Sequence, residues 1–144
     1  MRRASRSRTD ASAARRPAVL AVLADADHAV RGWSCEGAAD CCRFGVTGRE
    51  PYLTEAEWSL VQAEVARQGR RMPSVRADEI CPFLTEGARC SIYPVRPLGC
   101  RTFHCHRAAG PKQSRAALAE LPRRLEELSR DPRERGRRLT AWLG

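Results

Sequence analysis

The cysteines are the residues of this chain best suited to chemistry, and all seven fall between positions 35 and 105 of its 144 residues. Thiolate sulfur binds zinc and iron strongly, and a structural zinc site takes four such ligands in a tetrahedron. Ligands distant in sequence can share a site when a cysteine turn meets a later hairpin. We therefore predict that the cysteines bind metal, with these candidate ligands: Cys35, Cys41, Cys42, Cys81, Cys90, Cys100 and Cys105.

The adjacent pair Cys41-Cys42 bears on the number of metal ions. Neighbouring side chains diverge along an extended backbone, so we do not expect both sulfurs in one tetrahedral shell. Two sites, or one multi-metal cluster, would use both, and seven cysteines with one histidine would fill two four-ligand sites. His104 and His106 flank Cys105 and are the candidates for that histidine. Alternatively, one member of the pair is simply packed.

Disulfide bonds are the main alternative use of so many cysteines. An odd number leaves one thiol over in any complete pairing. An exported chain would also need a leader, and the apolar run over residues 18–24 is short and follows an unusually long basic segment. No stretch approaches the roughly 18 apolar residues of a membrane span. We expect a soluble, cytoplasmic protein with reduced thiols.

The net charge of +9 belongs to the two ends of the chain. Residues 1–17 carry six Arg and one Asp, and residues 101–144 carry eleven basic and five acidic residues, whereas residues 18–100 carry nine basic and eleven acidic ones. Three arginines, Arg43, Arg96 and Arg101, lie near cysteines in sequence and could screen the charge of a metal–thiolate site, or else are simply solvated.

Two stretches predict regular elements around the cysteines. Thr54-Glu55-Ala56-Glu57 is a capping box, and the apolar positions that follow predict a helix ending near Gly69. The apolar runs over 82–84 and 91–93 predict a small β-hairpin whose ends carry Cys81 and Cys90. Residues 70–80 are predicted to form a loop.

The remaining segments set the predicted domain limits. Residues 1–17 read as a disordered basic arm, and a short helix is predicted over 18–30 after Pro17. The cysteine-bearing domain is assigned to 18–110 and an Arg-rich helical extension to 111–144. In that extension, leucines spaced three or four residues apart predict a helix that Pro122 kinks or restarts, and Asp131-Pro132 predicts the start of a last one. These apolar faces are expected to pack on the domain, with a partner-binding helix as the alternative.

Several ordered motifs resemble one known family. They are Cys35-Glu36-Gly37-Ala38-Ala39-Asp40-Cys41-Cys42, Leu53-Thr54-Glu55-Ala56-Glu57, Cys81-Pro82-Phe83-Leu84, Cys90-Ser91-Ile92-Tyr93, Arg96-Pro97, Cys100-Arg101 and Phe103 to Cys105. Together they resemble the YkgJ-type cysteine-cluster family, described as chelating zinc or iron, some members of which are labelled iron–sulfur oxidoreductases. The resemblance covers residues 33–106 and implies metal chelation by the matched cysteines, without supplying a reaction.

One position departs from the family pattern. The family's first motif runs C-x-x-C-G-x-C-C, so it has a cysteine where this chain has Ala38. Alanine cannot ligate a metal. The first site is therefore one ligand short, or Asp40 or a histidine replaces the sulfur, or an exchangeable ligand occupies an open position.

The sequence therefore predicts a small, metal-stabilised α+β fold with short helices, one hairpin, irregular cysteine-bearing loops and a helical C-terminal tail. The leading function is binding of a zinc or iron ion. The first alternative is an iron–sulfur redox protein, although no familiar ferredoxin spacing is present. The second is a zinc-stabilised nucleic-acid-binding module whose Arg-rich ends contact phosphates, although few aromatic residues are available for base stacking. No protein partner is indicated.

Overall fold

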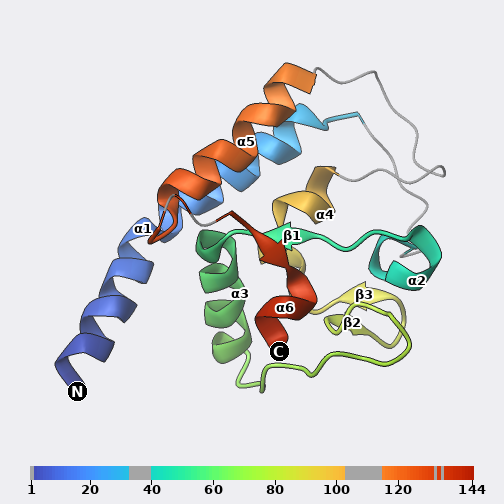
Figure 1. The fold of residues 1–144 in the computed structure, drawn as a ribbon, viewed down its shortest axis with the longest axis horizontal. Coiled ribbons are helices and arrows are strands. Elements are labelled where there is room, and N and C mark those ends of the chain that lie inside the picture. Colours follow the sequence, from blue (N-terminus) through green and yellow to red (C-terminus); the bar gives the residue numbers. More distant parts are fainter. Residues whose placement is uncertain (1, 33–39, 103–114, 132, 134) are drawn as a thin grey trace.

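Three helices form one side of the molecule in the computed structural model, which describes residues 2–32, 40–102, 115–131, 133 and 135–144 (Figure 1). They are α1 (Arg2–Ala29), α3 (Glu55–Arg67) and α5 (Arg115–Leu128). The other elements, in chain order, are η1 (Asp40–Cys42), α2 (Phe44–Thr47), β1 (Tyr52–Leu53), β2 (Leu84–Thr85), β3 (Arg89–Cys90), η2 (Tyr93–Val95), α4 (Leu98–Thr102), β4 (Arg137–Arg138) and α6 (Leu139–Leu143). This small α+β arrangement confirms the predicted fold class.

Helix α1 differs from the prediction of a disordered arm over residues 1–17, because the helix begins at Arg2 and continues through Pro17. The segment is rich in alanine and arginine, which are strong helix formers. The contacts of Arg15 with α3 further show that this part of the chain is not merely solvated. The boundaries of the domain itself stay a prediction.

Helix α3 begins and ends as predicted. The hydroxyl of Thr54 accepts the backbone N–H of Glu57 at 3.3 Å, and the Glu57 carboxylate accepts the backbone N–H of Thr54 at 2.7 Å, so both halves of the capping box form. The helix stops at Arg67, just before Gly69, whose φ of +66° is a left-handed conformation that glycine adopts without strain.

The helices α1, α3 and α5, together with Leu98 of α4, bury one apolar cluster, which we call the helical core. Figure 1 shows α5 lying along the second half of α1. The leucine spacing in α5 is confirmed as its buried face, but Pro122 does not restart the helix. Pro122 is exposed, so the carbonyl that loses a helix partner there can bond to water. The buried members of the cluster are Val19, Val22, Leu23, Ala26, Ala56, Leu60, Leu98, Leu121 and Leu125.

A second apolar cluster, which we call the cysteine core, lies on the other face of α3. Its buried members are Leu53, Trp58, Val61, Val65, Cys81, Phe83, Ile92 and Leu139, and Cys42 and Cys90 pack against it. The predicted hairpin is present, with Leu84 opposite Cys90 and Thr85 opposite Arg89. Its paired strands lie nearer the turn than predicted, so Cys90 is within β3.

The C-terminal segment closes the cysteine core through a strand pair that the sequence did not predict. Strand β4 pairs antiparallel with β1, placing Arg138 opposite Tyr52 and Arg137 opposite Leu53. In α6, Trp142 stacks on Trp58 with ring centroids 5.8 Å apart, which confirms that the tail packs on the domain. The predicted start at Asp131 is wrong: its carboxylate accepts the Arg133 N–H at 2.9 Å, but the last helix begins only at Leu139.

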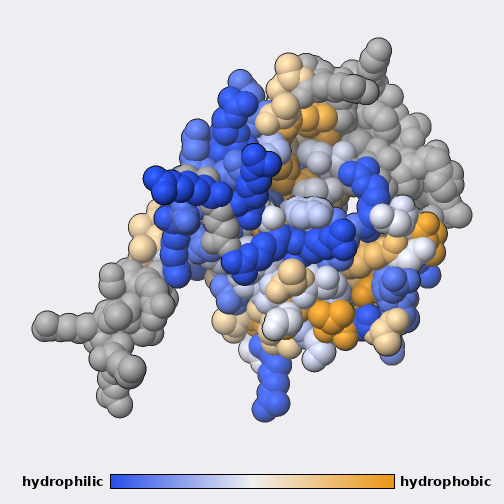
Figure 2. Space-filling view, viewed as in Figure 1, coloured by the Kyte–Doolittle hydropathy of each residue, from blue (hydrophilic) through white to orange (hydrophobic). Residues whose placement is uncertain are grey.

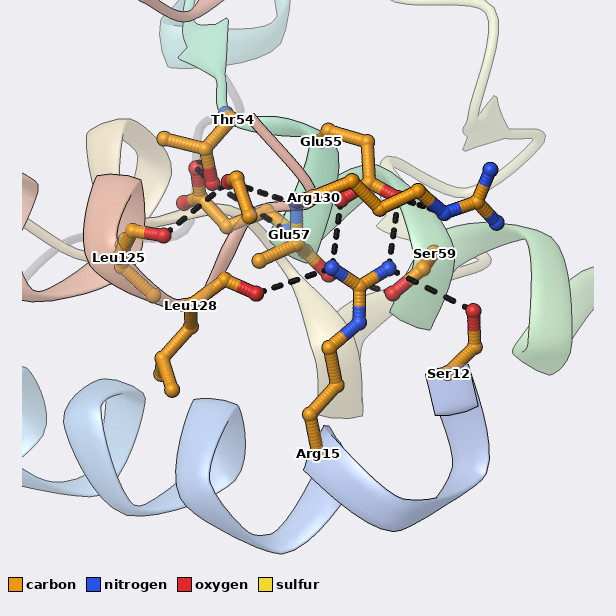
Figure 3. Close-up of polar contacts among 11 residues, drawn as sticks. Ser12, Arg15, Thr54, Glu55, Glu57, Ser59, Leu125, Leu128 and Arg130 are labelled. Atoms are coloured by element: carbon orange, nitrogen blue, oxygen red, sulfur yellow. Dashed lines mark hydrogen bonds and ion pairs between the residues drawn. The ribbon is translucent and has the colours of Figure 1, made fainter. Parts of the chain in front are cut away.

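An ion pair ties the N-terminal helix to α3 (Figure 3). Both Nη atoms of Arg15 donate to the Glu55 carboxylate at 2.6 Å, and Nη1 also donates to the carbonyl of Leu128 at 2.9 Å. The backbone N–H of Arg130 donates to the same carboxylate at 3.2 Å. One carboxylate thus joins α1, the start of α3 and the end of α5.

Among the described residues, no helix combines the length and apolar character that crossing a bilayer requires.

Candidate metal centre

Five of the seven candidate cysteines fall within the described residues. Cys41 and Cys42 lie in η1, Cys81 precedes the hairpin, Cys90 lies in β3 and Cys100 lies in α4. No disulfide joins any two of these five described cysteines. Cys35, Cys105, His104, His106 and Ala38 lie outside the described residues.

Backbone contacts bring the first cysteine segment onto the second. The Cys81 N–H donates to the Cys42 carbonyl at 2.7 Å, and Arg43 and Ile80 form an isolated antiparallel bridge beside it. The thiol of Cys42 forms side-chain hydrogen bonds with both Cys41 and Cys81. Segments about 40 positions apart in sequence therefore meet at these sulfur atoms.

The thiols also influence one another's ionisation. A hydrogen bond with Cys41 lowers the pKa of Cys42, but the hydrogen bond with Cys81, burial and the charges of Cys81 and Cys90 together raise it to about 12. Burial raises the pKa of Cys100, and the neighbouring Cys42, Cys90 and Cys41 raise it further. The described cysteines are thus close enough to oppose one another's negative charge.

Burial likewise raises the pKa of Cys90, and the Cys41 charge adds to this, although the Ile92 backbone and Arg96 act in the opposite direction. The Arg96 charge therefore favours the ionised form of the Cys90 thiol. Grouped thiols with raised pKa values hold their protons until a cation replaces them. The chemistry of this donor set fits a thiophilic metal ion such as zinc or iron.

The described residues do not by themselves enclose an ion. Within residues 40–102 and the other described ranges, no three Cys, His, Asp or Glu side chains lie close enough together to hold a metal. The structure thus groups the described sulfurs in one region without forming a closed ligand shell from them. The predicted ligand set stays a prediction.

Arg101 has a role that the sequence did not reveal. Its side chain, only 5% exposed, donates to Asp27 Oδ2 at 2.6 Å and to the carbonyls of Arg96 and Pro94 at 2.8 and 3.0 Å. It therefore fixes α4, which carries Cys100, against α1. Asp27 lies 74 positions away, so no local sequence pattern could have indicated the pair.

Glu57 was predicted to cap α3, but it also holds α4. Its Oε1 atom accepts the backbone N–H of Leu98 at 2.8 Å, while Oε2 accepts from Thr54. Burial raises the pKa of Glu57, and the hydrogen bonds from Thr54 and Leu98 oppose that rise. One buried carboxyl group thus joins the starts of two helices, and the second helix carries Cys100. The capping box was the available signal, but it did not reveal the second bond.

A cavity of about 320 Å³ lies beside the cysteines, between α3, α4, α5 and the segment leading into β1. Cys41 and Cys100 line it, together with Glu57 and, from the C-terminal segment, Gly136. Figure 2 shows the face of the molecule that carries α5 and β1. On this face, hydrophobic residues lie among hydrophilic ones. The cavity brings part of the cysteine group next to a space large enough for small molecules or hydrated ions.

Comparison with known proteins agrees with this donor chemistry. The model of the CxxCxxCC family, described as a putative zinc- or iron-chelating domain, matches residues 34–122. The match covers more than half of the chain and includes all seven cysteines. No curated protein and no solved structure matches the chain.

Proposed function

We propose that this chain, which belongs to the CxxCxxCC family of zinc- or iron-chelating domains, binds a zinc or iron ion through the thiolates of its clustered cysteines. The family match bears out the resemblance seen in the sequence motifs. The observation that carries the proposal is the grouping of the described cysteines around Cys42, whose thiol hydrogen-bonds with both Cys41 and Cys81, while the pKa values of Cys42, Cys90 and Cys100 are all raised.

The chain's own residues explain how such a site is assembled. The Cys42–Cys81 backbone hydrogen bond joins the first two cysteine segments, while Glu57 and Arg101 fix the helix that carries Cys100. A bound ion would neutralise the thiolates and crosslink these segments. Cys35 and Cys105, from outside the described residues, are proposed to complete the ligand set. We propose that the protein works in the reducing environment of the cytoplasm, where thiols stay available to bind a metal.

The test is elemental analysis of protein purified without oxygen, combined with a visible spectrum. We expect close to one equivalent or more of zinc or iron. Replacing Cys81 or Cys100 by Ser should release metal, whereas Thr102→Ser, a matched change on the same helix as Cys100, should not. Less than roughly a tenth of an equivalent of any transition metal in the parent protein would contradict the proposal.

The same spectrum separates a simple ion from the iron–sulfur alternative. Zinc has no visible absorption, whereas iron–sulfur clusters are strongly coloured because their thiolate and sulfide ligands transfer charge to iron. Protein that stays colourless after anaerobic reconstitution with iron and sulfide would exclude the redox alternative while leaving zinc binding intact.

A further inference from the structure

The cavity beside the cysteines separates them into two groups. Of the five described cysteines, Cys41 and Cys100 line the cavity, whereas Cys42, Cys81 and Cys90 are not among its lining residues. The latter three pack in or against the cysteine core. One side of the cysteine group therefore faces packed side chains, and the other side faces a space with room for several water molecules.

The charge of the cavity suits a cation. Three carboxyl groups line it, those of Glu50, Glu57 and Glu126, against one guanidinium, that of Arg49. Even with Glu57 left out of the count, two acidic side chains line the cavity against one guanidinium. A partly enclosed space lined by acidic groups concentrates positive ions, because its low-dielectric walls focus the field.

The sequence gives a further reason to expect a metal site that faces a cavity. Ala38 stands where the family pattern has a cysteine, so this chain offers one thiolate fewer to the ion. Sites with a full set of protein ligands are closed and structural, whereas sites with fewer keep a position for water or another exchangeable ligand. A cavity wall is the place where such a position is reachable from solvent.

We propose that this cavity is the route by which the metal ion enters and leaves the cysteine cluster, so that the site exchanges its metal instead of sealing it in. The proposal rests on the proposed metal-binding function. A small chelator that approaches through the cavity reaches the ion beside Cys41 and Cys100. The C-terminal segment contributes Gly136 to the wall, although it lies beyond the family match, so this chain's own extension helps to form the route.

Neighbouring positions on α5 allow a matched test of the route. Pro122 lines the cavity, and Arg123 beside it is exposed and is not among the lining residues. In zinc-loaded protein, Pro122→Trp should slow the transfer of zinc to the coloured chelator 4-(2-pyridylazo)resorcinol several-fold, without changing the amount of zinc bound. Arg123→Trp should release zinc at the parent rate. Equal release rates for the two variants would overturn the proposal.

A second matched pair guards against an effect of Pro122 on folding. Glu126 also lines the cavity, and its neighbour Glu127 is exposed and is not among the lining residues. Glu126→Trp should slow zinc release and Glu127→Trp should not. A slowing by both variants would point to general rigidity and would count against the route.

A third measurement needs no bound metal and so separates the two proposals. Protein treated briefly with N-ethylmaleimide and analysed by peptide mass spectrometry should show Cys41 and Cys100 protected in Pro122→Trp relative to Arg123→Trp, with Cys42, Cys81 and Cys90 unchanged. If the parent protein binds no metal but this pattern appears, the proposed function fails while the cavity remains a route to the thiols. Identical labelling in the two variants would refute the route itself.

Discussion

The helical core and the cysteine core share helix α3, but they are held together in different ways. The helical core joins helices of 28, 13 and 14 residues, which satisfy most of their own backbone hydrogen bonds. Apart from α3, the cysteine core is built from elements of two to five residues. Elements so short gain little stability alone, because the cost of starting a helix or a strand pair is spread over few bonds.

The polar contacts differ in the same way. The helical side is tied by an ion pair between α1 and α3, with side chains 15% and 19% exposed. On the cysteine side, the thiols lie close to one another, and burial together with the charges of Cys42, Cys90 and Cys41 raises the pKa of Cys100. The helical core is therefore held by apolar packing and ion pairs, whereas the cysteine core contains groups that favour a cation.

Removing the metal should have the largest effect on stability, and this effect should be confined to the cysteine core. Binding of a structural zinc ion contributes on the order of 10 kcal/mol in small domains, so its loss should open the region that it crosslinks. We expect amide hydrogen exchange over residues 80–102 to accelerate strongly after chelation, while exchange in α5 changes little. Mass spectrometry of peptides from both regions provides the measurement. Equal acceleration in both would mean that the two cores unfold as one unit.

Leu125→Ala should have the opposite effect: it should destabilise the helical core without releasing the metal. Leu125 is fully buried in the helical core, and removing such a side chain leaves a cavity that costs about 2–5 kcal/mol. Urea unfolding should show this loss, while the amount of bound metal stays at the parent level. Glu127→Ala, on the exposed face of the same helix, is the matched control. A metal content that falls along with stability would show that the cysteine core depends on the helical one.

In both cores, the sequence predicted the interactions between residues close in sequence and missed those between distant residues. The capping box of α3, the leucine face of α5 and the hairpin turn are local patterns, and the structure confirms them. The pairing of β1 with β4 was missed because Tyr52 and Arg138 lie 86 positions apart. Helix formation before Pro17 was missed because residues 1–17 lack the apolar periodicity of an amphipathic helix, although alanine and arginine favour helices.

The candidate site shows the same limit. Residue type alone identified the cysteines as candidate ligands. No pattern indicated that the Cys81 N–H would donate to the Cys42 carbonyl, or that the Leu98 N–H would donate to Glu57. Spacing alone also could not show that Cys41 and Cys100 line a cavity. Such contacts depend on tertiary packing, which brings together residues that are distant in sequence.

Glu57→Gln tests the connection between the two cores and should have an intermediate effect. The carboxylate accepts backbone N–H groups from Thr54 and Leu98 on different oxygens, and an amide offers only one oxygen. The buried donor left without a partner should cost about 1–3 kcal/mol. Because α4 carries Cys100, metal affinity should also fall, by about tenfold, as for other groups that orient ligands.

Two measurements define this outcome: a urea midpoint, and a metal-binding titration in competition with a chelator. Glu127→Gln, an exposed change of the same type, should alter neither. Lower stability with unchanged metal affinity would show that Glu57 caps α3 without positioning Cys100.

Arg15→Ala should have the smallest effect, and it should depend on pH. Burial raises the pKa of Glu55, but the hydrogen bonds from Arg15 and Arg130 outweigh it and hold that pKa below its ordinary value of 4.5. A lowered pKa in the folded state stabilises the protein above the unfolded value, and this contribution is lost as pH falls through the folded value. At neutral pH the variant should therefore lose about 1 kcal/mol, since the pair is only partly buried. The difference should shrink as the pH is lowered through 4.5 and below, measured by urea unfolding of both proteins across that range. A cost that stays constant with pH would mean that Arg15 acts through its bond to the Leu128 carbonyl, because that contact carries no titrating group.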